Sequence, residues 1–457
     1  MRENATRQHT ATLRTRVRGP VFLPGDEGYD AERSGFQLDD PHRPAVVVGA
    51  RSAADIRAAV AFAAERALPV AVQATGHGLA TRAHGGVLVT TRRLGGLHVD
   101  PTARTAALEP GVTWGQVIEA AARHGLAPLN GSSPGVGAVG YVLAGGLGLL
   151  GRRYGWAADH VRSLDVVTAD AQLRHVTATG HPDLFWALRG GGGGLGIVTR
   201  LEVELVPLGS VYGGALFFDA EHAGPVLDAF RSWTETLPED LTSSFALVPF
   251  PDLPMLPEPL RGRYVASVRI AFAGDAVAGE RLVEPLRAIA PTLMDTVREL
   301  PWTESDTIAT DPPAPHAYHG IGVLLRDLDA EAARTILERG GPGAAVPCVV
   351  QVNHLGGALA RPPASPNAVG HRDARYLLRV LSAVGEAGIA PIVDVHEGLV
   401  EALGDRCVGR SPAFQFGAHP PEQALVCYEP DACERLAAIK AAYDPGSVFV
   451  GGASGAR

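Results

Sequence analysis

The chain has 457 residues, of which 46% are hydrophobic and 19% are charged, a balance typical of a folded globular protein. Its formal net charge of −9, without any block of Lys or Arg, argues against nucleic acid or an anionic membrane as a partner. The length favours two domains over a single core.

The sequence carries no secretory or membrane-spanning signal. Its basic first residues lack an apolar segment, and no run reaches the roughly 18–20 apolar residues that cross a bilayer. The four cysteines lie in the last quarter without CxxC spacing, and His and acidic residues do not cluster at metal-ligand spacing. We therefore expect a soluble, cytoplasmic protein with free thiols and no metal site.

The first part of the chain predicts a β-α-β unit after a flexible lead-in over residues 1–20. An apolar strand over residues 44–48 is followed by helical spacing of apolar residues from 52 to 66, with Ser52 as the N-cap. The next strand, residues 69–73, runs directly into the turn ATGHG. Further strands are expected at residues 86–90, 105–108 and 161–168, and a second amphipathic helix at 113–124.

Glycine dominates the segment from Pro134 to Val198, which opens with PGVGAVGYVLAGGLGLLGRRYG and closes with RGGGGGLGIVT. Because glycine has no Cβ and permits positive φ, such a backbone can lie flat against a ligand. The run predicts a large flat cofactor with phosphates. A nicotinamide-binding Rossmann fold does not fit, because the glycines do not open a helix after the first strand and no acidic residue follows about 20 residues later.

From about Val211 strand-like and helix-like segments alternate, which predicts a mixed sheet with helices packed on one face. Strands are expected at residues 213–218, 264–273, 321–325 and 345–354. Helices are expected at residues 223–236, 279–289, 330–339 and 375–384. The Pro-rich stretches 250–259 and 311–315 predict loops over a site, and residues 432–443 predict a last helix.

Five segments, taken together and in order, resemble the FAD-linked oxidases related to berberine bridge enzyme, within the vanillyl-alcohol-oxidase superfamily. They are VQATGHG at 72–78, the glycine run ending YGWAADHV, DLFWALRGGGGGLGIVT at 183–199, NHLGGALAR at 353–361 followed by HRDARYL, and LAAIKAAYDPGSVF at 436–449. The resemblance implies an α+β protein with a two-domain PCMH-type FAD-binding fold. The FAD-binding domain would cover residues 1–206, with its core at about 40–206. Residues 207–409 would form a substrate domain, an antiparallel sheet backed by helices, and residues 410–457 would return to the first domain.

The resemblance also implies how FAD is held. His77 stands where the family's R-S-G-G-H turn places a histidine that commonly bonds the 8α-methyl carbon of the flavin, and imidazole is a competent nucleophile. Many relatives add a bond from a cysteine ahead of a P-x-V-G segment, but the matching residue here is Ser133, which implies a single anchor. Backbone N–H groups of the turn at 74–78 and the loop at 132–140 would face the pyrophosphate. The expected cofactor-binding residues are Gln73, Ala74, Thr75, Gly76, His77, Gly78, Ser133, Pro134, Val136, Gly137, Gly140, Tyr141, Gly145, Gly146, Gly148, Asp159, Gly196, Ile197 and Val198.

The catalytic base is the open question. In many relatives it is the tyrosine of a Y-x-N segment, which corresponds here to Ala413-Phe414-Gln415 and therefore lacks the tyrosine. Another residue can serve instead, the substrate can be acidic enough to need no strong base, or the flavin can shape a pocket for a redox-neutral cyclisation. The candidate bases are Tyr141, Tyr154, His354 and His419.

The expected function is an FAD-linked oxidase that passes two electrons from a small organic alcohol, phenol or amine of secondary metabolism to O2, releasing H2O2. The alternatives are a flavin-containing redox-neutral cyclase and a protein that binds or confers resistance to a toxic metabolite. The sequence leaves the substrate and the oligomeric state open.

Overall fold

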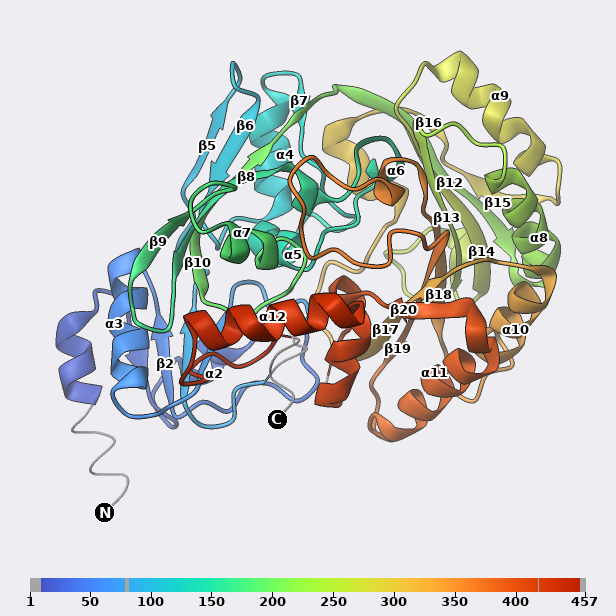
Figure 1. Ribbon diagram of the computed structural model, residues 1–457. Coiled ribbons are helices and arrows are strands. Elements are labelled where there is room, and N and C mark those ends of the chain that lie inside the picture. The colour runs from blue at the N-terminus through green and yellow to red at the C-terminus, as the bar shows by residue number, and fades with distance from the viewer. Residues whose placement is uncertain (1–9, 79–81, 418, 453–457) are drawn as a thin grey trace.

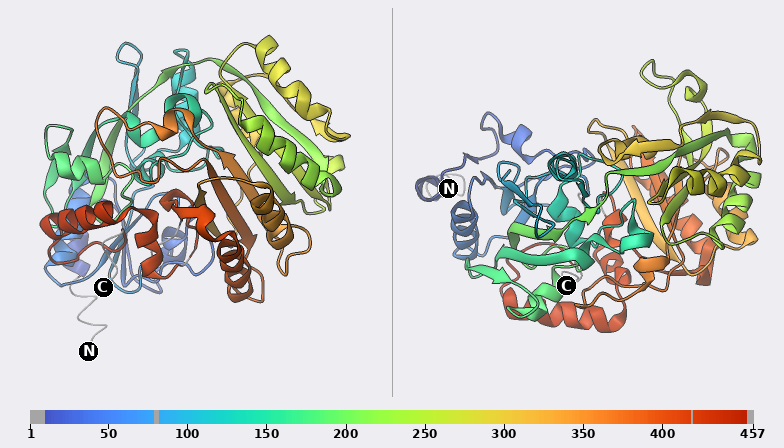
Figure 2. Two further views of the ribbon diagram at one scale, coloured as in Figure 1. Left: turned by 45° about the vertical axis from the view of Figure 1, so that its right-hand side comes forward. Right: turned by 90° about the horizontal axis from the view of Figure 1, so that it is seen from above.

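The computed structural model describes residues 10–78, 82–417 and 419–452. Figure 1 shows two halves, each built around β-sheet, with loops and short helices between them. The two views in Figure 2 show the same division. The α+β class predicted from the sequence is confirmed.

The first half contains a four-stranded and a five-stranded sheet. The four-stranded sheet has the order β1 (Val21–Phe22), β2 (Val46–Gly49), β4 (Val87–Thr90) and β3 (Val70–Gln73), and its last three strands are parallel. The five-stranded sheet is antiparallel, with the order β5 (Leu97–Asp100), β6 (Thr105–Leu108), β10 (Ile197–Glu204), β8 (Val161–Val167) and β9 (Leu173–Val176). A small pair joins β7 (Leu126–Ala127) to β11 (Val206–Pro207).

Helix α3 (Ala53–Ala64) crosses from β2 to β3 and completes the predicted β-α-β unit. Its start is fixed as expected, because the Ser52 hydroxyl accepts a hydrogen bond from the backbone N–H of Asp55 at 3.2 Å. The second predicted helix is α4 (Trp114–Ala122), whose N-terminus is capped by a capping box of Thr113 and Gln116. The other helices of this half are α2 (Tyr29–Arg33), α5 (Ala138–Leu143), α6 (Gly151–Tyr154) and α7 (Pro182–Ala187).

One element of the first half differs from the expectation of a flexible lead-in over residues 1–20. Residues 10–16 are helical. The side chain of Leu13 is fully buried in the core that also holds Ile56 and Val89. This apolar contact orders a segment whose composition alone suggests no structure.

The second half is one nine-stranded sheet in which every pairing is antiparallel, so the expected mixed sheet is wrong and the antiparallel one is confirmed. Helices α8 (Ala223–Thr234), α9 (Ala276–Arg287), α10 (Ala330–Gly340) and α11 (Ala390–Leu403) cover its outer face (Figure 1). Phe218, Phe230 and Phe245 are fully buried between this face and the helices. The strands are β12 (Ser210–Asp219), β13 (Leu241–Pro249), β14 (Tyr264–Phe272), β15 (Thr292–Asp295), β16 (Arg298–Pro301), β17 (Tyr318–Leu325), β18 (Val349–His354), β19 (Tyr376–Ala383) and β20 (Cys407–Arg410).

The helix expected at residues 375–384 is wrong, because this segment is strand β19. It pairs with β17 on one side and β18 on the other. Its apolar residues are buried on both faces, Leu378 against the helices and Leu377 toward the first half. A short apolar run buried on both faces has no alternation by which a strand can be distinguished from a helix.

The end of the chain returns to the first half through α12 (Pro430–Tyr443), which lies below α7 in Figure 1. The Arg435 guanidinium contacts the Asp183 carboxylate at 3.0 Å. The segment after α12 runs beside β3, where the Val70 N–H donates to the Val448 carbonyl oxygen and the Val450 N–H to the Val70 carbonyl oxygen. The domain limits at residues 206 and 409 stay a prediction.

Candidate active site

A cavity of about 1000 Å³ lies between the two halves. One wall is the turn after β3 together with the glycine-rich segment around α5. The opposite wall is the open face of the nine-stranded sheet, and both predicted Pro-rich loops contribute to the rim through Phe250, Leu253, Asp311 and Pro312. The site therefore combines segments that are distant in the sequence.

The turn after β3 aims the His77 imidazole into this cavity. Gly76 has a φ of +73°, and a Cβ there would lie 2.7 Å from the Gly35 Cα, so the turn requires glycine. The Phe36 ring stacks on the imidazole with centroids 4.0 Å apart. Thr75 Oγ1 lies 2.9 Å from His77 Nδ1 and accepts a hydrogen bond from the Gly137 N–H at 3.2 Å.

The other ring nitrogen, His77 Nε2, is buried and has no hydrogen-bond partner among the described residues. Burial lowers the pKa of His77 to about 4, so the ring is neutral at physiological pH. An added Cβ at Gly135 would lie 3.7 Å from His77 Nε2 and 3.9 Å from Ser133 Oγ. His77 and Ser133 therefore both lie next to Gly135, and both line the cavity.

The wall near His77 also presents bare backbone to the cavity. Gly78, Gly140 and Gly193 line it, and a Cβ added at any of the three would meet no atom of the described residues within 4 Å. Such positions let a flat ring system or a pyrophosphate approach the main chain closely. The unpartnered His77 Nε2 and this glycine-lined surface are the features expected of a site that binds FAD.

Most of the predicted cofactor-binding residues line the cavity, and the others do not. The cavity is lined by Gln73, Ala74, Thr75, Gly76, His77, Gly78, Ser133, Val136, Gly137, Gly140, Tyr141 and Gly148. Outside its lining are Pro134, Gly145, Gly146, Asp159, Gly196, Ile197 and Val198.

The residues outside the lining have packing roles. A Cβ on Gly146 would lie 2.5 Å from the Tyr141 ring, so this glycine makes room for an aromatic side chain. Ile197 and Val198 begin β10, and both are buried in the cores of the first half. Much of the glycine-rich sequence therefore serves close packing next to the cavity.

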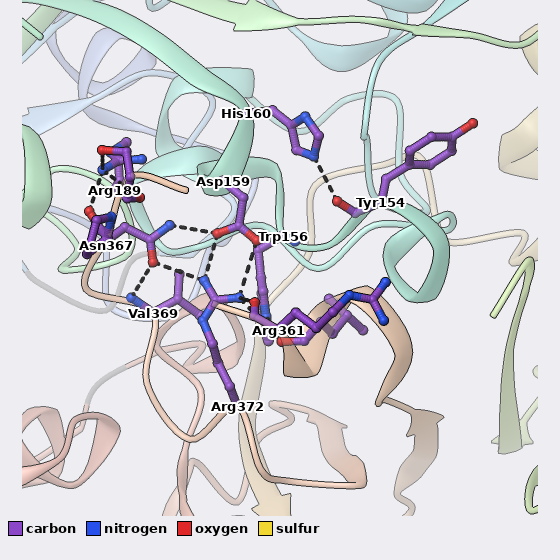
Figure 3. Close-up of polar contacts among 12 residues, drawn as sticks. Tyr154, Trp156, Asp159, His160, Arg189, Arg361, Asn367, Val369 and Arg372 are labelled. Carbon is purple, nitrogen blue, oxygen red and sulfur yellow. Dashed lines mark hydrogen bonds and ion pairs between the residues drawn. The ribbon is translucent and has the colours of Figure 1, made fainter. Parts of the chain in front are cut away.

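Asp159 binds other protein groups (Figure 3). Its carboxylate accepts hydrogen bonds from Arg372 Nη2 at 2.6 Å, from Asn367 Nδ2 at 2.7 Å and from the Trp156 N–H at 3.0 Å. This network ties the end of the glycine-rich segment to residues just before β19.

Three comparisons with known proteins agree with this geometry. Residues 44–177 match a family described as an FAD binding domain. The chain is 27% identical to (R)-6-hydroxynicotine oxidase of Paenarthrobacter nicotinovorans over 461 residues, which cover 95% of both chains. Solved structures with the same fold include a berberine bridge enzyme-like protein of Physcomitrella patens, at 19% identity with a TM-score of 0.83 and 97% of both chains covered. Another is the glucooligosaccharide oxidase of Acremonium strictum, at 23% identity, a TM-score of 0.83 and 98% of both chains, described as carrying a 6-S-cysteinyl, 8α-N1-histidyl FAD.

Residues 44–177 therefore match an FAD binding domain, and the chain resembles the PCMH-type FAD-linked oxidases over nearly its whole length. FAD binding and the assignment as an FAD-linked oxidoreductase follow from these matches. Among the described helices, none is long and apolar enough to cross a membrane. The four cysteines, Cys348, Cys407, Cys427 and Cys433, are free.

This FAD-linked oxidoreductase has no titratable side chain at the segment that corresponds to the family's Y-x-N tyrosine. Ala413 and Gln415 both line the cavity. The Gln415 amide nitrogen donates to the carbonyl oxygens of Gly322 at 3.1 Å and Ser411 at 3.0 Å. The segment lines the cavity, but neither Ala413 nor Gln415 has a side chain that can serve as a base.

Two of the four candidate bases, Tyr141 and His354, line the cavity. The Tyr141 hydroxyl is buried without a partner among the described residues, and burial raises the pKa of Tyr141, so it remains protonated. His354 Nε2 lies 3.0 Å from an Arg152 guanidinium nitrogen, and burial lowers the pKa of His354 to about 3. Neither side chain is a ready base.

The other two candidates lie away from the cavity. Tyr154 points away from the Asp159 network in Figure 3, and its carbonyl oxygen lies 2.8 Å from His160 Nε2. His419 Nδ1 lies 3.0 Å from Gln423 Oε1, and burial lowers the pKa of His419.

Several residues of the cavity wall were not predicted from the sequence: Phe36, Arg269, Tyr318, Gln351, Asn353 and Arg379. Asp311 was expected only as part of a Pro-rich loop over the site. Tyr318 donates a hydrogen bond to the His77 carbonyl oxygen at 2.5 Å and so joins the sheet to the histidine turn. Asp311 accepts a hydrogen bond from the Ser132 hydroxyl. An arginine inside an otherwise apolar strand, as in YVASVRIAF and YLLRVLSA, was the available signal for Arg269 and Arg379.

Proposed function

We propose that the protein is an FAD-dependent oxidase that carries its flavin on a single bond to His77 and passes two electrons from a small organic alcohol, phenol or amine to O2. The observation that carries this proposal is the neutral His77 ring, which lines a cavity of about 1000 Å³ and whose buried Nε2 has no partner among the described residues. Bound FAD supplies a two-electron acceptor that O2 reoxidises.

Thr75 prepares His77 for this bond. With Nδ1 held at Thr75 Oγ1, the ring orientation is fixed and Nε2 is the nitrogen left to bond the 8α carbon. Bound FAD would supply the 8α-methyl carbon for this bond; one hydrogen atom would leave that carbon and one the His77 ring, and O2 would take up both as H2O2. Ser133 lies next to Gly135, as His77 does, but offers a hydroxyl instead of a thiol, so one bond forms where the glucooligosaccharide oxidase carries two.

We assign proton acceptance from the substrate to Asp311. It is the carboxylate that lines the cavity among the described residues, and its bond to Ser132 holds it over the loop that also carries Ser133. Tyr141 is held protonated and His354 is occupied by Arg152, which leaves Asp311 as the better base. The test is its asparagine variant, in which turnover should fall while flavin content does not.

Acid precipitation of the purified protein, followed by mass spectrometry of its peptides, tests the covalent link. Flavin on the peptide that contains His77, and free FAD released from a His77→Ala variant, are the expected results. Free FAD released from the unmodified protein would reject the covalent link and retain the fold.

A redox-neutral cyclase or a metabolite-binding protein is the second candidate, and one observation favours it. Ala413 lines the cavity at the position of the usual base, so the site lacks the group with which relatives start an oxidation. Anaerobic mixing with substrate separates the two functions. An oxidase loses its flavin absorbance near 450 nm by reduction, whereas a cyclase or a binding protein keeps it.

A further inference from the structure

Two arginines form a charged patch on the open face of the nine-stranded sheet, where they line the cavity. Arg269 lies on β14 between Val268 and Ile270, which are buried against the outer helices. Arg379 lies on β19 between Leu378 and Val380, which are buried in the same core. Because successive strand residues alternate between faces, both arginines project toward the cavity.

A row of neutral polar side chains connects the two arginines across the sheet. In the strand register, Ser244 pairs with Arg269 and with Asn353, and Gln351 pairs with Arg379. The Gln351 amide nitrogen donates to Ser244 Oγ and to Asn353 Oδ1, both at 3.0 Å. An Arg379 Nη1 hydrogen bond to Gln351 Oε1 at 2.9 Å orients that guanidinium, which also lies 4.4 Å from the Phe414 ring centroid.

The two guanidinium groups lack a direct anionic partner. In residues 10–78, 82–417 and 419–452, neither Arg269 nor Arg379 forms an ion pair, and the Arg269 guanidinium makes no hydrogen bond. Arg379 Nε is buried and unpartnered within the same residues. Burial lowers the pKa of both arginines, and the nearby Asp311 carboxylate opposes that shift. Desolvated cations of this kind favour an anion that completes their hydrogen bonds.

The charges of the cavity specify how much negative charge is needed. Apart from histidines, the charged side chains in its described lining are Arg269, Arg379 and Asp311, which sum to +1. Four histidines also line the cavity, and three of them, His42, His77 and His354, add nothing at neutral pH, because burial lowers their pKa values to about 4, about 4 and about 3; the fourth, His316, is left out of the sum. For these three side chains alone, apart from the FAD that the opposite wall would hold, one monoanion balances the charge, whereas a phosphate dianion would leave an excess negative charge.

We infer that this wall binds a carboxylate of the substrate, so the small organic substrate of the proposed oxidase is an organic acid. A planar carboxylate matches the fork of a guanidinium and carries the single charge that the wall lacks. The apolar lining residues Val248, Ile308 and Leu381 would hold the rest of the molecule. This inference rests on the proposed function and adds the substrate class to it.

Calorimetric binding to the purified holoprotein tests the carboxylate site with two matched probe pairs, benzoate against benzamide and cinnamate against cinnamamide. Each pair differs in charge and hardly in shape. The acids should bind on the order of tenfold or more tightly than the amides, as expected for charge-assisted hydrogen bonds. Equal affinity of acid and amide in both pairs would overturn the inference.

Variants then locate the binding site. Arg269→Gln and Arg379→Gln should each weaken acid binding by on the order of tenfold and leave amide binding unchanged. Arg269→Lys and Arg379→Lys, which keep the charge, should retain part of the preference. Arg263→Gln is the matched control, because Arg263 is an exposed arginine just before β14 that pairs with Asp219, and it should leave both probes unaffected.

Failure of this inference can be told apart from failure of the proposed function. Flavin content and the His77 peptide are measured on the same preparations. If flavin is bound to His77 but the acids bind no more tightly than the amides, the carboxylate site alone is overturned. The same conclusion follows if Arg263→Gln weakens acid binding as much as Arg269→Gln does. Acid preference in a preparation without flavin would support the site and reject the oxidase.

Discussion

Because His77 is neutral, we expect covalent flavin attachment to depend only weakly on pH. An imidazole with the ordinary pKa of 6.5 is only about 9% neutral at about pH 5.5 and loses its nucleophilic form as the pH falls. With the pKa lowered to about 4 by burial, His77 stays about 97% neutral at that pH. The attachment rate should therefore change by less than about twofold between roughly pH 8 and pH 5.5, where an exposed histidine would lose about tenfold.

The assay uses protein made under riboflavin limitation and mixed with FAD at a series of pH values. Samples are quenched in acid, and covalent flavin is read by fluorescence in denaturing gels, with His77→Ala as the zero. A rate that falls along a titration curve with a midpoint near 6.5 would refute the burial argument. Thermal midpoints must be recorded at each pH. Between pH 6.5 and about 4, His77 is protonated in the unfolded protein but stays neutral in the folded one. The free energy of unfolding is therefore expected to fall as the pH drops through this range.

Three other substitutions test the local structure of the site. Thr75→Val should slow flavin attachment by on the order of tenfold, because the ring loses its anchor, and Thr75→Ser should restore it, both read from the same gels. Gly146→Ala should lower the urea midpoint and the flavin content, because its Cβ would lie 2.5 Å from an aromatic carbon. Gly125→Ala is the control: its φ of +67° is similar but its Cβ would meet no described atom within 4 Å, so it measures the cost of backbone strain alone. Asp159→Ala should cost about 3 kcal/mol in urea unfolding, since it leaves a largely buried arginine unpaired, whereas Asp183→Ala in an exposed pair should cost at most about 1 kcal/mol.

Local patterns in the sequence predicted the part of the site that local geometry builds. The resemblance of VQATGHG to the family's R-S-G-G-H turn singled out His77, and the turn itself is local, because it directly follows β3 and Gly76 supplies its positive φ. The same holds for α3 and α4, whose starts depend on side-chain caps within three residues. These features require no knowledge of distant parts of the chain.

Features that depend on cross-strand register could not be predicted in the same way. The wall formed by Arg269 and Arg379 exists because β14, β13, β18 and β19 lie side by side in an order that is not their order in the sequence. Taking residues 375–384 for a helix concealed the face on which Arg379 lies. Glycine density also overstated the cofactor contacts, because close packing of Gly146 against Tyr141 produces the same sequence pattern as contact with a ligand.

Asp311 connects the two proposals and separates them in one variant. Asp311→Asn keeps the size of the side chain and its bond to Ser132, while the charge of the wall rises from +1 to +2. Benzoate should then bind more tightly, because a negative neighbour of the two arginines is gone. Turnover should fall by about a hundredfold or more, because the proton acceptor is also gone. If Asp311 had only a structural role, its substitution would weaken benzoate binding and turnover together. Tighter benzoate binding with slower turnover is therefore the result expected only of a carboxylate that both balances the arginines and accepts the proton.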